Sequence, residues 1–168
     1  PLTLISHRNG ELFGIMPFTG TDISRPPVSA WDEQLEVSTP YYLSTWLETY
    51  DITTEFAPGS RTGIFRFKFG GSKQRAIFLA NMKKGNWKQL STRSFSGEEF
   101  FNGMKAYVSA ELSTDGKLID KESGNRKWQY IDLGANDAKP VEFRYAISFI
   151  SAEQAAKTLS EDISAKSF

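Results

Sequence analysis

Hydrophobic and polar residues alternate along most of the chain, and this alternation predicts short β-strands. It is clearest over residues 141–150, where Val141, Phe143 and Tyr145 begin a hydrophobic face and the positions between them are mostly polar. Residues 36–69 repeat the pattern in three consecutive runs. Alternation with period two, rich in aromatic and β-branched residues, is typical of strands with one buried face and one face in water. We therefore expect paired strands in both regions.

The other runs complete a series of about ten short strands at intervals of roughly 8–12 residues, which is the sequence pattern of a β-sandwich. Between the strands we expect a loop over 19–32, a turn at 96–99 and a polar loop at 120–126. Residues 114–117 (TDGK) predict a hairpin-type turn. The expected strands lie at 2–5, 11–18, 42–48, 51–56, 63–69, 74–81, 87–95, 104–112, 127–133 and 141–150.

One segment, near the end of the chain, has a helical pattern. Ser151 is followed three residues later by Gln154, which is the spacing of a capping box at a helix N-terminus. Ala155, Leu159 and Ile163 then recur at every fourth position and form one apolar stripe that can lie against a sheet. The pattern as a whole predicts an all-β fold: a two-sheet antiparallel β-sandwich with a C-terminal helix.

The composition supports a single β-sandwich domain over residues 1–168 and excludes several classes of function. Hydrophobic residues make up 39% of the chain and aromatic residues 14%, which is enough to build a core. The 20 basic residues balance the 20 acidic ones, so no net field attracts nucleic acid. The absence of Cys excludes disulfides and thiolate chemistry. No apolar run approaches the ~20 residues of a membrane span, and no segment resembles a signal peptide.

The ionisable residues show no pattern typical of a catalytic or metal site. Adjacent acidic residues occur at Asp32-Glu33, Glu98-Glu99 and Glu161-Asp162. On a strand such neighbours point to opposite faces, and at a turn or on a helix they are interpreted as solvated surface charges. His7 is the only His and cannot build a zinc site by itself. We therefore predict neither catalytic residues nor metal ligands in this chain.

Exposed aromatic side chains can hold sugars, because the C–H groups of a pyranose ring pack on an aromatic face. Trp46, Trp87 and Trp128 alternate with polar residues, and each is either such a platform or a Trp at the edge of the core. Trp31 lies in the loop over 19–32 and is expected to pack on the edge of the sandwich. Glu36 and Glu55 are assigned structural roles.

Several short segments form an ordered series that covers nearly the whole chain. They are residues 11–17 (ELFGIMP), 40–42 (PYY), 50–52 (YDI), 55 (E), 61–67 (RTGIFRF) and 148–159 (SFISAEQAAKTL). In this order and spacing they resemble the N-terminal β-domain of the glycoside hydrolase family 92 α-mannosidases. No single segment is specific, and the order of the series carries the resemblance.

The resemblance implies both a fold and an activity for the parent protein. The family domain is a sandwich of the galactose-mutarotase-like supersandwich type. Family members are calcium-dependent, inverting exo-α-mannosidases whose acid, base and most calcium contacts belong to a C-terminal (α/α)6 domain. The chain, which starts at Pro1 without Met, would be a fragment lacking that domain. Its partners would be the catalytic domain and a mannose-containing glycan, and its location exported: periplasmic, cell-surface or secreted, of the bacterial type.

The same resemblance suggests where the chain contacts substrate. In the family, an S-H-x-x-G-T-G loop before the D-x-L-x-M-P strand lines the mannose pocket. Here the segment 6–10 (SHRNG) is shorter and lacks G-T-G, so His7, Arg8 and Asn9 are the candidate substrate-binding residues. The chain by itself is predicted to be inactive and to support the catalytic domain. The alternatives are an independent carbohydrate-binding module and a structural interaction domain without a catalytic partner.

Overall fold

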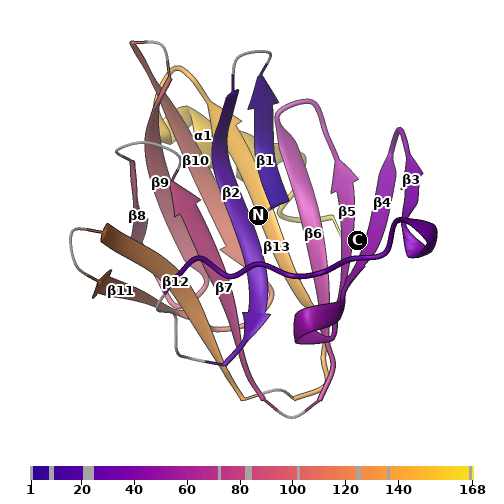
Figure 1. The fold of residues 1–168 in the computed structure, drawn as a ribbon. Coiled ribbons are helices and arrows are strands. Elements are labelled where there is room, and N and C mark those ends of the chain that lie inside the picture. Colours follow the sequence, from indigo (N-terminus) through magenta and orange to yellow (C-terminus); the bar gives the residue numbers. More distant parts are fainter. Residues whose placement is uncertain are drawn as a thin grey trace.

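The computed structural model describes the backbone of residues 2–7, 10–20, 25–71, 73–81, 85–101, 103–123, 126–135, 137–166 and 168. Within these ranges the chain forms thirteen strands, two short 3-10 helices and one α-helix. The strands build two antiparallel sheets stacked face to face, and the α-helix lies behind the larger sheet (Figure 1). The predicted two-sheet antiparallel sandwich with a C-terminal helix is therefore confirmed.

The two sheets draw their strands from all parts of the chain. The five-stranded sheet has the order β1 (Leu2–His7), β2 (Gly10–Thr19), β7 (Gln74–Asn81), β12 (Arg126–Ala135) and β11 (Lys117–Ser123). The eight-stranded sheet has the order β3 (Val37–Thr39), β4 (Tyr42–Leu47), β5 (Ile52–Pro58), β6 (Thr62–Phe69), β13 (Val141–Ser148), β10 (Met104–Leu112), β9 (Ser94–Phe101) and β8 (Asn86–Gln89). The helical segments are η1 (Glu33–Leu35), η2 (Glu48–Tyr50) and α1 (Ala152–Asp162).

The hydrophobic core lies between the sheets and is built from alternate residues of their strands. On β13 the predicted inner face is confirmed for Val141, Phe143 and Tyr145, which are each at most 3% exposed, but the strand ends at Ser148 and Phe149 is exposed. Burying a side chain of this size stabilises the fold by roughly 1.5–3 kcal/mol. The largest fully buried side chains are Trp87, Phe13, Phe65, Phe67, Phe95, Phe143, Leu12, Ile15, Ile52, Ile77, Leu79 and Ile131.

The segment over residues 25–36 covers part of the larger sheet that the smaller sheet does not reach. Figure 1 shows it in purple, crossing in front of β6 and β5 on its way to β3. It is tied to η2, since the backbone N–H of Glu48 donates to the Ala30 carbonyl at 3.0 Å. The N–H of Thr49 likewise donates to Ser29 Oγ at 3.0 Å. These hydrogen bonds fix the segment against the end of β4.

The helix α1 covers the outer face of the larger sheet, against β10 and β13. Its N-terminus is confirmed at the predicted residue, because Ser151 Oγ accepts a hydrogen bond from the N–H of Gln154 at 3.1 Å. The apolar stripe is buried as expected, with Leu159 and Ile163 packed on Ile64 and Ala146. No helix in the described part of the chain is long and apolar enough to span a bilayer.

The strand and turn predicted between residues 87 and 99 are wrong. Residues 87–95 form two strands, β8 and β9, with a turn over 90–93, and the predicted turn at 96–99 lies inside β9. Gly97, which suggested a turn, instead makes room for neighbours. A Cβ at this position would come within 2.9 Å of the Trp87 ring and 2.8 Å of Val108. A strand glycine here marks close packing rather than a turn.

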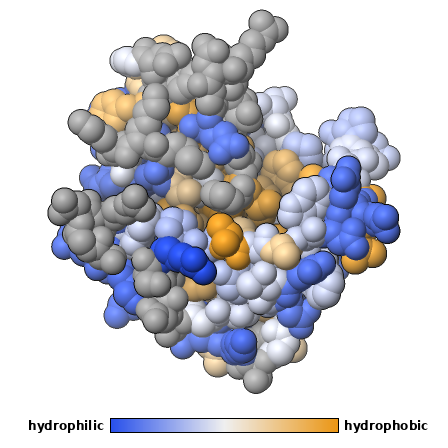
Figure 2. Space-filling model, viewed as in Figure 1, coloured by the Kyte–Doolittle hydropathy of each residue, from blue (hydrophilic) through white to orange (hydrophobic). Residues whose placement is uncertain are grey.

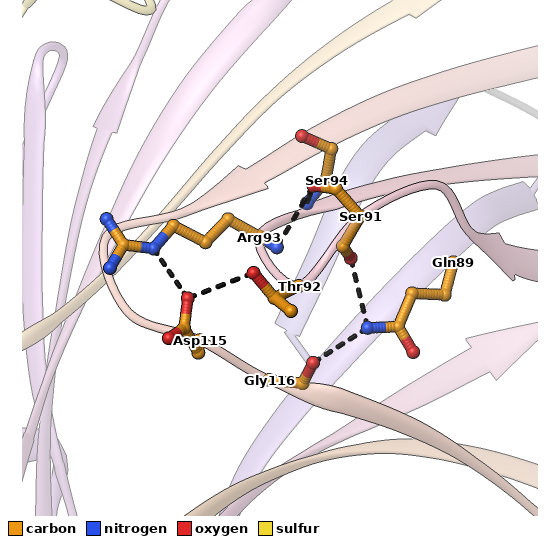
Figure 3. A network of polar contacts seen from close by, with 7 residues as sticks. All are labelled: Gln89, Ser91, Thr92, Arg93, Ser94, Asp115 and Gly116. Carbon is orange, nitrogen blue, oxygen red and sulfur yellow. Dashed lines mark hydrogen bonds and ion pairs between the residues drawn. The ribbon is translucent and has the colours of Figure 1, made fainter.

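The turn at Thr114–Lys117 is also misassigned, because β10 and β11 belong to different sheets. The turn crosses between the layers and is fastened to the β8–β9 turn, as Figure 3 shows. Asp115 Oδ1 accepts hydrogen bonds from Arg93 Nε at 2.8 Å and Thr92 Oγ1 at 3.0 Å. Gln89 Nε2 donates to the carbonyl of Gly116 at 2.8 Å. The polar residues predicted as a loop over 120–126 begin in β11 and reach β12.

Candidate functional site

A groove of about 670 Å³ opens where β1, the β5–β6 turn and the end of β13 meet. Its volume falls within the range of small-molecule and peptide sites. Figure 2, viewed in the same direction as Figure 1, shows hydrophobic surface between the positions of β1 and β6. The lining residues are Leu4, Phe56, Pro58, Gly59, Ser60, Arg61, Thr62, Tyr145, Ile147, Ser148, Phe149 and Ile150.

The inner wall of the groove is rigid because its aromatic rings are closely packed. A Cβ on Gly63 would lie 2.7 Å from both Phe56 and Tyr145, so only glycine fits between these two rings. The Tyr145 hydroxyl donates a hydrogen bond to the Leu4 carbonyl at 2.6 Å, which ties β13 to β1 across the sandwich. Burial raises the pKa of Tyr145, so the hydroxyl stays protonated and remains a donor.

The rim of the groove exposes large apolar side chains just before α1. Phe149 is 45% exposed and Ile150 is 77% exposed. The backbone there is held in place: Ser148 Oγ accepts from the N–H of Ile150 at 3.0 Å, and the N–H of Ile147 donates to the Arg61 carbonyl at 2.9 Å. Fixed, exposed apolar residues beside an apolar groove are typical of a surface that contacts another protein or domain.

A cluster of charged residues occupies the outer face of the larger sheet. The Glu55 carboxylate receives Arg66 Nε at 2.7 Å, Lys68 Nζ at 3.0 Å and the Tyr42 hydroxyl at 2.8 Å. The hydrogen bond from Arg66 is the main cause that lowers the pKa of Glu55 from 4.5 to about 2, although burial opposes it. The Arg66 guanidinium also lies over the Phe168 ring at 4.1 Å. The cluster therefore holds the last part of the chain on the sheet.

Of the predicted substrate-binding residues, only the backbone of His7 lies within the described part of the chain. The backbone of His7 ends β1 and pairs with Gly10 of β2. Leu4, which lines the groove, lies three residues earlier, a separation of about 10 Å along a strand. Arg8 and Asn9, together with the side chain of His7, lie outside the described residues. Their role in substrate contact therefore stays a prediction.

The acidic pair Glu98-Glu99 was predicted to be a pair of solvated surface charges, and the structure contradicts this for one of the two residues. Glu99 is fully buried, so its assignment as a solvated surface charge is wrong. Strand β9 turns Glu99 inward and Glu98 outward, and Glu99 Oε1 accepts the N–H groups of Gly85 and Phe100, each at 2.9 Å. Among the described residues, no three His, Asp or Glu side chains gather as metal ligands.

The four Trp side chains separate into buried and exposed ones. Trp87 is 2% exposed and belongs to the core, and Trp128 packs against the core beside Phe78. Trp46 remains 38% exposed on the outer face of the larger sheet. Trp31 is 53% exposed, which is more than the predicted packing on the sandwich edge implies.

The groove and the Glu55 cluster were not found by sequence reasoning. Two signals pointed to them. Gly63 stands inside a strand pattern, where glycine often marks close approach of other groups. Glu55 and Arg66 occupy polar positions on neighbouring strands, but only the register shows that they are directly opposite each other.

Comparison with known proteins assigns this sandwich to a family. The family model described as the glycosyl hydrolase family 92 N-terminal domain matches residues 5–148. No sequence among the curated proteins matches the chain.

Solved structures share the fold. A family GH92 inverting mannosidase from Bacteroides thetaiotaomicron VPI-5482 superimposes with a TM-score of 0.80 at 19% identity, over 92% of this chain and 24% of its own. A family GH92 α-mannosidase from Bacteroides thetaiotaomicron gives 0.76 at 19% identity, over 90% and 26%. The GH92 family glycosyl hydrolase ccman5 gives 0.74 at 19%, over 95% and 26%. The chain thus spans about a quarter of the length of these proteins.

Proposed function

The chain belongs to the glycosyl hydrolase family 92 N-terminal domain family, as the motif series indicated, and from this premise we propose that it is the sandwich domain of an α-mannosidase. The observation that carries the proposal is the match of the family model over residues 5–148. It is supported by a shared sandwich in proteins that are themselves described as mannosidases. The substrate of the parent protein is then a mannose-containing glycan.

Within that protein we assign this domain a supporting role rather than the proton transfers of hydrolysis. Inverting hydrolysis uses a general acid and a general base on two carboxyl groups roughly 6.5–9.5 Å apart. Such groups work best with a pKa near the working pH. The pKa of Glu55 is about 2 because Arg66 binds it, which suits a permanent ion pair and not a proton donor. Glu99 is already engaged by two backbone N–H groups.

The groove is the surface through which this domain contacts the rest of the enzyme. Its exposed Phe149 and Ile150 would be covered by the catalytic part of the polypeptide, for which the matched structures leave about three quarters of their length. His7, Arg8 and Asn9, at the end of β1, would then face the sugar pocket between the two parts. Calcium, if the parent enzyme uses it, would be held mainly by residues outside this chain, and the enzyme would act on glycans outside the cytoplasm.

The proposal is tested by comparing this chain with the full polypeptide that encodes it. Both are assayed for mannose release from an α-linked mannobiose, with and without a calcium chelator, and cell fractions are assayed for the enzyme. We expect turnover by the full polypeptide, in an exported fraction, and none by the 168-residue chain. Turnover by the short chain would contradict the supporting role, and an inactive full polypeptide would contradict the mannosidase assignment.

The substrate contact is tested in the full polypeptide by His7→Ala. We expect a higher KM for the mannobiose, because a donor to the sugar hydroxyls is lost while the catalytic carboxyls remain. The matched control is Lys127→Ala, at a side chain that is 83% exposed and paired with Glu122 only at the surface. Equal kinetic constants for the two variants would show that His7 does not contact the substrate.

A further inference from the structure

Trp46 of β4 is an exposed aromatic side chain whose orientation is fixed by the fold. Its indole Nε1 donates a hydrogen bond to Asp51 Oδ1 at 3.2 Å, while the side chain remains 38% exposed. Strand β4 lies near the right-hand edge of the larger sheet in Figure 1, away from the helix α1. An indole that is both exposed and held by its N–H offers a preformed flat surface to a ligand.

Asp51, which accepts the hydrogen bond from the Trp46 indole, is fixed in position by its own backbone contacts. Asp51 adopts the left-handed conformation, with φ at 53°, at the end of η2. Its carbonyl accepts the N–H of Gly70 at 2.7 Å. A side chain at Gly70 would overlap with the Asp51 carboxylate, so the carboxylate packs directly against the backbone of Gly70. The orientation of the indole therefore depends on a chain of short-range contacts that are complete before any ligand binds.

Polar side chains surround the indole in strand register. Trp46 pairs with Thr53, and Thr53 pairs with Lys68, so these three side chains form a row across β4, β5 and β6. Ser44 lies two residues before Trp46 on the same face. Neighbouring strands are about 4.8 Å apart, which places these hydroxyl and ammonium groups within reach of a ligand on the indole.

The charges around this surface are balanced. Lys68 Nζ, on a side chain that is 47% exposed, is paired with the Glu55 carboxylate at 3.0 Å. The Asp51 carboxylate accepts the indole N–H. A balanced, hydroxyl-rich surface does not attract a polyanion by its field. It fits a neutral ligand with an apolar face and hydroxyls at its rim.

We propose that Trp46, with Ser44, Thr53 and Lys68, forms a sugar-binding platform for a pyranose ring of a neutral, mannose-containing glycan. The C–H face of the sugar packs on the indole, and its hydroxyls bond to the three polar side chains. The choice of mannose rests on the proposed function, whereas the stacking of a neutral pyranose rests on the geometry of the platform alone. The role would be to hold a glycan chain on this face of the domain.

The test follows the indole N–H signals of the 168-residue chain by NMR during titration with an α-linked mannotriose, up to about 50 mM, where even millimolar binding saturates. The four Trp residues give separate signals, and Trp46→Ala identifies the relevant one. We expect the Trp46 signal to shift and the signal of the buried Trp87 to stay in place. A Trp46 signal that does not move at the highest concentration overturns the proposal.

Affinity is then compared between variants by calorimetry or affinity electrophoresis. We expect Trp46→Ala to weaken binding at least tenfold and Trp31→Ala, a matched exposed Trp outside the sheet, to change it less than twofold. Equal losses in both variants, or none in Trp46→Ala, overturn the platform. A Trp46 signal that shifts with protein concentration in the absence of sugar also overturns it, because a second copy of the chain would then occupy this face.

The same titration with a cello-oligosaccharide tests the stacking of a neutral pyranose on Trp46 separately from the preference for mannose. Binding of both sugars at Trp46, together with mannosidase activity of the full polypeptide, supports both proposals. Binding of the cello-oligosaccharide alone keeps the stacking site and contradicts the mannose assignment. An active mannosidase whose Trp46 responds to neither sugar contradicts the platform and leaves the proposed function intact.

Discussion

Replacing Glu55 by Gln should destabilise the domain by an amount that depends on pH. The Glu55 carboxylate is 7% exposed and binds Arg66, Lys68 and Tyr42 on the outer face of the larger sheet. Glutamine keeps the size of the side chain but removes the charge, so it imitates protonated Glu55 at every pH. The variant therefore measures what ionisation of this one carboxyl contributes to folding.

The magnitude follows from the pKa of Glu55. The hydrogen bond from Arg66 lowers it from 4.5 to about 2 in the folded protein. At 1.36 kcal/mol per pH unit, this difference corresponds to about 3 kcal/mol of stability at pH 7. A lowered pKa contributes stability that is fully present above the unfolded value and is lost as the pH falls through the folded value. The contribution should therefore decrease below about pH 4.5, to about 1 kcal/mol at pH 3.

The measurement is urea unfolding of the natural chain and of Glu55→Gln at pH 7 and at pH 3. We expect a difference in the free energy of unfolding of about 3 kcal/mol at pH 7 and less than half of that at pH 3. The control is Glu122→Gln, which breaks a surface pair to Lys127 and should change stability by less than about 0.5 kcal/mol. A difference that is the same at both pH values, or no larger than the control, would refute the assignment of a buried, ionised Glu55.

Substitutions at three further positions test the packing and the helix cap, each by urea unfolding at pH 7. Gly63→Ala should destabilise the domain by about 1–3 kcal/mol, because the added methyl meets the rings of Phe56 and Tyr145 at 2.7 Å, and unchanged stability would contradict this tight fit. Phe143→Ala, at a position with no exposed surface, should lose about 3–5 kcal/mol, and a loss below about 1 kcal/mol would place this residue outside the core. Ser151→Ala should lose about 1 kcal/mol with the N-cap of α1, whereas Ser151→Asp should retain it.

Local features of the sequence were sufficient to predict the class of fold. The alternation over 141–150 has the period of a strand, and four of the five residues on its hydrophobic face are buried; the fifth, Phe149, lies beyond the end of β13 and is exposed. The helix α1 begins after Ser151 because its cap and apolar stripe lie within the thirteen residues 151–163. Such signals depend on neighbours in the chain, so a single sequence contains them in full.

The sequence-based predictions were wrong where a residue type is common in two structural settings and only tertiary packing selects one of them. Gly97 is a typical turn residue and Glu99 a typical surface residue, yet both lie inside β9. Gly97 gives space to Trp87, and Glu99 finds two backbone N–H donors. Residues 114–117 have the sequence of a hairpin turn, but they connect strands of different sheets. The residue types of a turn do not indicate to which sheet the next strand belongs.

Alternation and capping were enough to predict a β-sandwich with a C-terminal helix, and the order of the motifs indicated the family. The order of the strands, the groove beside β1, and the rows of side chains around Glu55 and Trp46 became visible only in the folded protein. The physical reason is distance along the chain. Periodicity and capping act within about ten residues, whereas these sites join residues that strand pairing brings together from separate parts of the sequence.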